Sequence, residues 1–234
     1  MNGQTVVVIG GSAGIGLSTA KQARAAGADV VLTGRNPERL ERAAAEVGAV
    51  RTAAFDASDH GAMARFLAEQ PRIDHVISTA GGPYYAPLAE IDIDAARRSL
   101  DDHFFLAINL AQRAAGVVGG SLTFISGTGG RKRGVGLSVI GAMTAAMPAL
   151  IANLALEAAP IRVNLIAPGF VDTPLSASLL GDQLDARRAQ LRDTLPIGRV
   201  VGPDDVAALA IHLMTNSALT GATYDVDGGQ QLVG

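Results

Sequence analysis

The sequence predicts an α/β protein whose core is a doubly wound parallel sheet of about seven strands, with helices on both faces. Short β-branched and aliphatic runs alternate along the chain with longer alanine-rich stretches, and right-handed crossovers turn that order into a parallel sheet. The runs are continuously apolar rather than alternating, which is typical of strands buried on both faces. No linker or repeat divides the 234 residues, so we expect a single domain over residues 1–234.

The expected strands are the β-branched runs that are bounded by glycine, proline or polar residues. They cover residues 5–9, 29–33, 50–55, 75–78, 122–126, 162–166 and 223–226. The segments between them favour helices, and a proline marks two of the starts, at Asn36-Pro37 and Gly202-Pro203. The helices cover residues 14–26, 37–47, 59–70, 93–117, 137–158 and 203–216. Pro148 lies inside the fifth of them and is expected to kink it.

One irregular segment stands outside this alternation, between the sixth strand and the last helix. Residues 169–195 are long for a connection and contain short helical patterns. The carboxyl ends of parallel strands gather at one edge of a sheet, and ligands bind there. We therefore expect residues 169–195 to form a lid-like insertion over that edge.

The composition excludes several classes of function. The chain has no Cys, which excludes disulfides, thiolate zinc sites and a cysteine nucleophile, and no metal-ligand spacing is present. A net charge of -3 with both signs interspersed argues against nucleic acid as a partner. We expect no apolar run near the roughly 20 residues of a bilayer span, and the N-terminus lacks a signal-peptide pattern. A cytoplasmic protein without a membrane partner is expected.

A glycine-rich turn follows the first expected strand and opens the first helix. Gly10 permits the tight turn, Gly14 lets the backbone approach a pyrophosphate, and Gly16 lets the helix pack closely on the sheet. The amide groups of a helix N-terminus bind phosphate. The turn therefore predicts a Rossmann-type dinucleotide site formed by Gly10, Ser12, Ala13, Gly14, Ile15 and Gly16.

The Gly-x-x-x-Gly-x-Gly spacing of this turn resembles that of the short-chain dehydrogenase/reductase (SDR) family, and the resemblance extends over nearly the whole chain. DHVISTAG at 74–81, RVNLIAPGFVDT at 162–173, LPIGR at 195–199 and DGG at 227–229 are similar to further motifs of the family. Within DHVISTAG, Ser78 and Thr79 stand where the motif of the family has two asparagines. The resemblance implies a nicotinamide dinucleotide cofactor, a homo-oligomer (dimer or tetramer), and cofactor contacts at Asp56, Ala57, Ala80, Gly81, Pro168, Gly169, Val171 and Thr173.

The residue after the second strand predicts which cofactor is bound. Dinucleotide sites carry an acidic residue there for a 2′-hydroxyl, or an arginine for a 2′-phosphate. This chain has Gly34 and Arg35 at that point, and a guanidinium suits bidentate contact with phosphate. The alternative is that Arg35 is a surface arginine that pairs with Glu38. We expect NADP(H) to be favoured over NAD(H).

The catalytic tetrad of the family is expected to be replaced. The resemblance implies a Tyr-x-x-x-Lys pair on the fifth helix for proton transfer, a serine after the fifth strand and an asparagine on the fourth helix. These positions fall on Ile140, Thr144, Gly127 and His103, respectively. The chain has only three tyrosines and two lysines, and none of them lies on the fifth helix. The catalytic residues are therefore unknown.

Two side chains are weak candidates for catalysis. His103 could act as an acid or base near neutral pH, or it could be a helix residue paired with Asp101, Asp102 or the backbone. Ser126 could contact substrate, or it could point to the other face of its strand because side chains alternate. Loop residues expected at the pocket mouth could also contact substrate, or could merely pack or be solvated; they are Tyr84, Tyr85 and the basic run Arg131, Lys132 and Arg133.

Three functions follow from these observations. The first is an NADP(H)-dependent oxidoreductase of atypical mechanism that transfers hydride to or from a small carbonyl, enone or imine substrate. Activated C=C or C=N acceptors need less acid help than an unactivated ketone. The second is a non-catalytic dinucleotide sensor or regulatory subunit, which the replaced tetrad favours. A non-redox enzyme on the same fold ranks last, because the glycine turn is retained.

Overall fold

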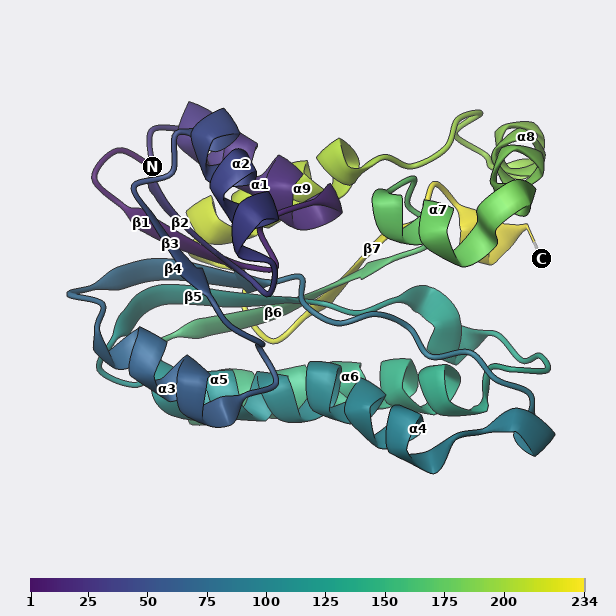
Figure 1. Ribbon diagram of the computed structural model, residues 1–234, viewed down its shortest axis with the longest axis horizontal. Helices are drawn as coiled ribbons and strands as arrows, with labels where there is room; N and C mark the ends of the chain where they lie inside the picture. The colour runs from purple at the N-terminus through teal and green to yellow at the C-terminus, as the bar shows by residue number, and fades with distance from the viewer. Residues whose placement is uncertain (234) are drawn as a thin grey trace.

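The computed structural model describes residues 1–233, and these residues form one sheet of seven parallel strands (Figure 1). The order across the sheet is β3-β2-β1-β4-β5-β6-β7, so the predicted fold class is confirmed. The strands are β1 (Thr5–Ile9), β2 (Asp29–Gly34), β3 (Arg51–Ala54), β4 (Ile73–Ser78), β5 (Val118–Ile125), β6 (Arg162–Pro168) and β7 (Thr223–Val226).

Helices cover both faces of the sheet (Figure 1). One face carries α1 (Gly14–Ala25), α2 (Pro37–Val47) and α9 (Pro203–Thr215). The other face carries α3 (His60–Ala68), α4 (Ile93–Leu100), α5 (Leu106–Ala114) and α6 (Ser138–Glu157). The segment expected to be a lid contains α7 (Pro174–Leu180) and α8 (Leu184–Thr194), which lie at the right-hand end of Figure 1 near the C-terminus.

The strands are buried on both faces, as their continuous apolar runs predict. In β1, Val6 and Val8 face a core cluster that includes residues of α1 and α9, whereas Val7 and Ile9 face a second cluster against α3, α5 and α6. All four side chains are fully buried. Successive side chains of a strand point to opposite faces of the sheet. One uninterrupted apolar run therefore provides buried side chains for the helix layers on both faces.

The chain reverses its winding direction between β1 and β4. These two strands pair directly, with β2 and β3 on one side and β5 to β7 on the other. Crossovers on the two sides leave in opposite directions, so a crevice opens at the carboxyl ends of β1 and β4. The glycine-rich turn after β1 and the residues after β4 meet at this crevice.

The single helix expected over 93–117 is instead three pieces. A π-helical segment, Asp101–Phe105, separates α4 from α5, and such insertions occur frequently at functional sites. The helix ends at Ala114, and Gly116 turns the chain with a φ of 78°. The next strand starts at Val118 rather than 122, because Gly120 lets β5 approach β4; a Cβ there would lie 2.5 Å from the carbonyl oxygen of Asp74.

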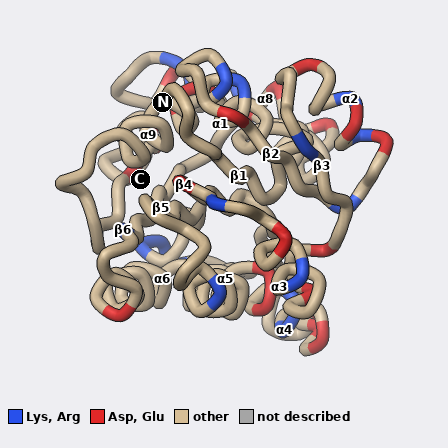
Figure 2. The backbone as a smooth tube through the Cα atoms, turned by 90° about the vertical axis from the view of Figure 1, so that its left-hand side faces the viewer, with Lys and Arg blue, Asp and Glu red and all other residues tan. Residues whose placement is uncertain are grey.

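The expectation that no apolar run approaches bilayer-spanning length is wrong for α6. It is 20 residues long, and 18 consecutive residues of it have a mean hydropathy of 1.8. Glu157 is its one charged residue. Figure 2 shows both acidic and basic positions on α2 and α4. Ile140, Met147 and Ile151 are buried in the core, which is the place of a core helix in an α/β protein. The helix continues through Pro148 without interruption.

Candidate functional site

A cavity of about 360 Å³ lies at the crevice between the carboxyl ends of β1, β2 and β4. It contains residues from five separate segments of the chain. Seven of the residues predicted to contact a cofactor line it: Gly10, Ser12, Arg35, Asp56, Ala57, Ala80 and Gly81. The fold therefore brings together positions that are up to about seventy residues apart in the sequence.

The turn after β1 is held so tightly that only glycine fits at two positions. Gly10 has a φ of 86°, and a Cβ there would lie 2.8 Å from Oγ1 of Thr79. A Cβ on Gly16 would lie 2.3 Å from the carbonyl oxygen of Gly10. The Thr79 hydroxyl donates to the carbonyl oxygens of Ile9 and Gly10 at 3.1 and 3.2 Å. Thr79 thus ties the end of β4 to the turn, in one of the positions where the family resemblance implies asparagine.

The N-terminus of α1 presents amide groups that no side chain caps. Its N-cap residue is Ala13, which has no polar side chain to accept from the first amides. Gly14 has a φ of 51°, and a Cβ there would lie 3.4 Å from Cγ2 of Thr173. Uncapped amides and the positive end of the helix dipole together suit an anion. Thr173 brings the 168–173 segment against this turn.

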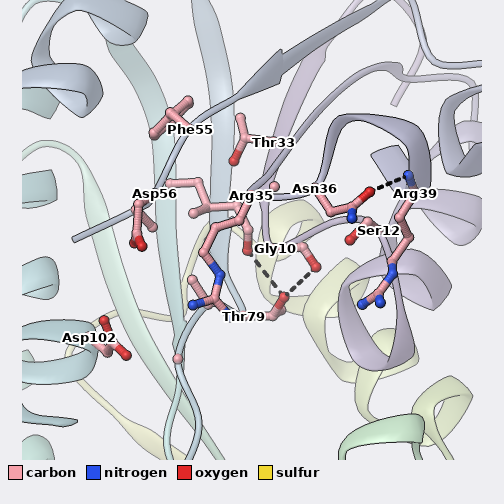
Figure 3. A pocket seen from close by; sticks show the side chains of 15 residues that line it. Gly10, Ser12, Thr33, Arg35, Asn36, Arg39, Phe55, Asp56, Thr79 and Asp102 are labelled. Atoms are coloured by element: carbon pink, nitrogen blue, oxygen red, sulfur yellow. Dashed lines mark hydrogen bonds between the residues drawn. The ribbon is translucent and has the colours of Figure 1, made fainter. Parts of the chain in front are cut away.

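Two arginines extend into the cavity from the segment after β2. Figure 3 shows Arg35 and Arg39 pointing into it, with Ser12 and Thr79 between their guanidinium groups in that view. Within residues 1–233, neither guanidinium forms a hydrogen bond or an ion pair, so the alternative pairing of Arg35 with Glu38 is not formed. Arg39 is on α2, whose N-cap Asn36 accepts from the Arg39 backbone amide at 2.8 Å. Two unpaired guanidiniums in one cavity suit a dianionic group.

Two carboxyl groups lie on the other side of Arg35. Asp56 accepts hydrogen bonds from the amide and hydroxyl of Ser58 at 3.1 and 2.8 Å. Asp102 lines the same cavity from the π-helical segment (Figure 3). Burial, with a smaller contribution from Asp56, raises the pKa of the Asp102 carboxyl above its ordinary value. The cavity is therefore basic at one end and acidic at the other.

The segment 168–173 is fixed from two sides. The backbone amide of Phe170 donates to Oε1 of Gln230 at 2.9 Å, and a Cβ on Gly169 would lie 2.6 Å from that same oxygen. Val171 pairs with Val201 in an isolated β-bridge. Asp172 accepts from Arg188 of α8 at 2.9 and 2.8 Å. These contacts hold the segment at the carboxyl edge of the sheet. None of Pro168, Gly169, Val171 and Thr173 lines the cavity, but Thr173 lies close to Gly14 of the glycine-rich turn.

Three of the four positions expected to carry the tetrad, Gly127, Ile140 and Thr144, lie near one another. A Cβ on Gly127 would lie 3.8 Å from Cγ2 of Thr144 and 3.7 Å from the carbonyl oxygen of Pro168. The Thr144 hydroxyl donates to the carbonyl oxygen of Ile140 at 2.8 Å. Ile140 and Thr144 are both buried. This part of the site presents an apolar surface with one hydroxyl that is already engaged.

His103 approaches the cavity from the π-helical segment. Its Nδ1 lies 2.9 Å from the carbonyl oxygen of Ser99 and donates to it, so the backbone pairing is the one observed. A Cβ on Gly81 would lie 2.7 Å from Cε1 and 3.0 Å from Nε2 of this ring. The ring therefore packs against the backbone of Gly81, where the absence of a Cβ leaves room for it. The left-handed φ of 94° at this position also favours glycine.

The remaining candidates are mostly engaged by the protein. The Ser126 hydroxyl is buried without a hydrogen-bond partner among the described residues. The Tyr84 hydroxyl accepts from the amide of Asp92 at 2.8 Å. Tyr85 is about half exposed, and its partial desolvation raises the pKa of its phenol. Arg131 forms a two-point ion pair with Asp225. No cluster of metal-ligating side chains occurs in the described chain.

Of the cavity residues that the sequence did not assign to the cofactor, two are charged: Arg39 and Asp102. In the sequence, Arg39 is only part of a helix start. Its position about one turn after Arg35 is a signal that both side chains could face the same edge of the sheet. Asp102 reads only as a neighbour of His103. Its cavity position follows from the π-helical turn, which shifts the helix face and leaves no sequence signature.

Three features together define a dinucleotide-binding α/β fold. They are the glycine-rich turn after β1, the uncapped N-terminus of α1, and the cavity at the crevice where the winding direction reverses. The sequence profile described as enoyl-(acyl carrier protein) reductase matches residues 10–231. The short-chain dehydrogenase/reductase ATR9 of Stachybotrys chlorohalonatus is 32% identical, with 98% of this chain and 97% of that protein covered. The chain belongs to the short-chain dehydrogenase/reductase superfamily of oxidoreductases, which confirms the family resemblance.

Solved structures agree with this assignment. MalC reductase/Diels-Alderase from Malbranchea aurantiaca superposes with a TM-score of 0.91 at 26% identity, covering 99% of this chain and 97% of that one. A small-chain dehydrogenase solved in complex with NADPH superposes with a TM-score of 0.83 at 30% identity, covering 98% and 99%. Both therefore share the whole architecture and not only the sheet.

Proposed function

We propose that this protein is an NADP(H)-dependent oxidoreductase that delivers hydride to an activated C=C or C=N bond. The observation that carries the proposal is the convergence of the unpaired guanidiniums of Arg35 and Arg39 on the cavity beside the glycine turn. Arginine pairs of this kind favour a 2′-phosphate over a 2′-hydroxyl. The match to a structure solved with NADPH supports the same cofactor.

The residues present fit each part of this cofactor. Arg35, Arg39 and Ser12 would hold the 2′-phosphate, and the uncapped amides of α1 would hold the pyrophosphate. Asp56, at the acidic end of the cavity, would accept from the exocyclic amine of the base. The absence of a Cβ at Gly10 and Gly16 lets the turn close against Thr79 and against its own backbone, and this closed turn would hold the amides of α1 in place for the phosphates.

The bond reduced is inferred from the residues that face the reaction. NADPH, when bound, supplies the hydride. We infer that the standard tetrad is absent, with Ile140, Thr144 and Gly127 in place of the tyrosine, lysine and serine, so no phenol would donate a proton to an alkoxide. General acids of this kind are worth about 10²–10⁴ in rate. An iminium ion needs no proton, and an enolate takes its proton from water, so these acceptors suit this site.

The test is NADPH oxidation measured by absorbance with a panel of ketones, enones and imines, together with NADPH affinity measured by fluorescence. We expect tight NADPH binding and turnover of enones or imines that exceeds turnover of matched ketones by at least about tenfold. The profile match to enoyl reductases supports the C=C acceptor. Tight binding with no turnover on any acceptor would contradict the enzyme and favour a dinucleotide sensor.

We also propose that the protein is a homo-oligomer that buries the outer face of α6. That face exposes a row of small residues, Ala142, Ala145, Ala149 and Ala152, followed by Leu156, which is 79% exposed. Small residues permit close approach of a symmetric partner helix. Light scattering should give a dimer or larger, and Ala149→Arg should give a monomer that still binds NADPH.

A further inference from the structure

We propose that the substrate is a bulky apolar molecule without an anionic group, held by an apolar rim on three segments beside the cofactor cavity. The inference rests on the proposed function, since it names the substrate class of the same site. The rim consists of Tyr85 and Leu88 after β4, Val135 after β5, and Leu175 and Leu179 of α7.

The rim side chains are large, apolar and open to solvent. Val135 is 89% exposed and Leu88 is 83% exposed. Tyr85, Leu179 and Leu175 are 54%, 50% and 46% exposed, respectively. Isolated exposed apolar residues are ordinary, but several gathered at one functional edge indicate a surface that a ligand covers.

The three segments meet at the carboxyl edge of the sheet. Each follows a strand, β4, β5 or β6, and Figure 1 shows α7 at the same end of the molecule as the loops after β4 and β5. A Cβ on Gly82 would lie 3.9 Å from Cδ1 of Leu175. The amide of Ala86 donates to the carbonyl oxygen of Gly136 at 3.3 Å. The loop after β4 is therefore hydrogen-bonded to the segment after β5 and lies beside α7.

The rim is continuous with the proposed cofactor site. The loop after β4 begins next to Gly81, which lines the cavity. α7 begins at its N-cap Thr173, whose methyl group lies close to the Gly14 turn. A substrate reaching the cofactor from this edge would pass between these two segments and touch Leu175.

The charge distribution argues against an anionic substrate. Residues 82–91, 134–139 and 173–181 contain one charged residue, Glu90, although 18% of the chain is charged. The nearby guanidiniums are already engaged: Arg131 with Asp225, and Arg133 with the carbonyl oxygens of Gly130 and Lys132 at 2.8 and 3.0 Å. The hypothesis that the basic run attracts an anionic substrate therefore finds no support from these two arginines.

The test is calorimetric titration of 3-alkyl-2-cyclohexenones, from methyl to octyl, into the protein alone and into the protein saturated with NADP⁺. Affinity should rise about two- to fourfold per added methylene. The octyl compound should bind better than its analogue with a terminal carboxylate. Leu175→Ser and Leu179→Ser should each weaken octyl binding at least about fivefold. The matched control is Val50→Ser, at a residue 57% exposed before β3 and so at the opposite edge, which should leave binding unchanged.

Four results would overturn the inference. Three of them are affinities that do not depend on chain length, tighter binding of the carboxylate analogue, and equal losses in Val50→Ser. A Val135→Ser variant that changes the oligomeric state in light scattering would also overturn it, because the rim would then be an interface between copies. If affinity rises with chain length but NADPH is not oxidised, the result supports the rim and contradicts the proposed function. If NADPH is oxidised but affinity does not rise with chain length, the result supports the proposed function and contradicts the rim.

Discussion

Gly16 shows how a single missing Cβ shapes the site. The first turn of α1 presses against the carbonyl oxygen of Gly10, and the Thr79 hydroxyl fills the space between them. No side chain larger than hydrogen can enter without moving backbone. The turn and the end of β4 therefore form one rigid unit. The amides at the N-terminus of α1, which would bind phosphate, are held in place by this unit.

We predict that Gly16→Ala weakens NADPH binding by at least about tenfold and destabilises the fold. The new Cβ would lie 2.3 Å from the Gly10 carbonyl oxygen and 2.6 Å from Thr79 Oγ1, and overpacking of this kind costs about 1–3 kcal/mol. Fluorescence titration and thermal unfolding measure the two effects. The control is Gly61→Ala in α3, where a Cβ meets only flexible side chains; equal effects at both positions would contradict the argument.

Residue roles could be predicted where a motif fixes the backbone. The glycines of the turn were identifiable because their spacing specifies a strand-turn-helix geometry. Arg39 and Asp102 were not, because convergence on a cavity depends on how a helix start and a π-helical turn are oriented in three dimensions. The unpartnered Ser126 hydroxyl likewise depends on which side of β5 the side chain takes.

At the scale of elements, α6 combines an ordinary core role with an unusual site face. Its inner side packs on the sheet, and the same helix presents Ile140 and Thr144 one turn apart. Residues at i and i+4 share a helix face. The helix thus keeps the geometry on which a Tyr-x-x-x-Lys pair could stand.

We predict that installing a serine, a tyrosine and a lysine at the positions expected for the tetrad creates ketone reduction. The variant combines Gly127→Ser, Ile140→Tyr and Thr144→Lys, and the new phenol would donate a proton to the alkoxide. NADPH oxidation with cyclohexanone should rise about 10²-fold or more, whereas Thr144→Lys alone should give no gain. Thermal unfolding and NADPH affinity establish that the variant is folded. A folded, NADPH-binding variant without a gain would refute the placement of the tetrad.

Element boundaries were less predictable than element types. The expected helix over 93–117 fails at the π-helical segment, since an extra residue per turn leaves the apolar pattern nearly unchanged. The strand expected at 122–126 starts earlier because glycines, which disfavour strands on average, are required where β5 approaches β4.

At the scale of the whole molecule, the sheet order follows from sequence because each connection is a right-handed crossover of ordinary length. The continuous apolar strands supply two helix layers, and their burial pattern was readable in advance. Several polar residues of the described chain are buried in that core, and His75 is the one histidine among them. His75 of β4 is 3% exposed, and its Nδ1 lies 2.9 Å from the Ser121 hydroxyl.

We predict that His75 makes stability fall in mild acid. Burial, aided by Arg162, lowers the pKa of His75 from 6.5 to about 4 in the folded state. The unfolded chain therefore binds this proton first, so the free energy of unfolding falls as pH drops from 6.5 to about 4, by at most about 1.4 kcal/mol per pH unit. Urea unfolding at several pH values should show a shallower slope for His75→Asn. An unchanged slope, or an equal change in the exposed control His60→Asn, would contradict this.

The central claim is that two guanidiniums recognise a 2′-phosphate. The most direct measurement is the Kd of NADPH and of NADH for the natural chain, Arg35→Ala and Arg39→Ala, with Arg97→Ala, an exposed arginine paired with Asp94, as the control. We expect NADPH to bind more tightly than NADH, and each cavity variant to lose about tenfold or more in NADPH affinity while NADH changes by less than about twofold. Equal losses for both cofactors, or tighter binding of NADH, would contradict the account.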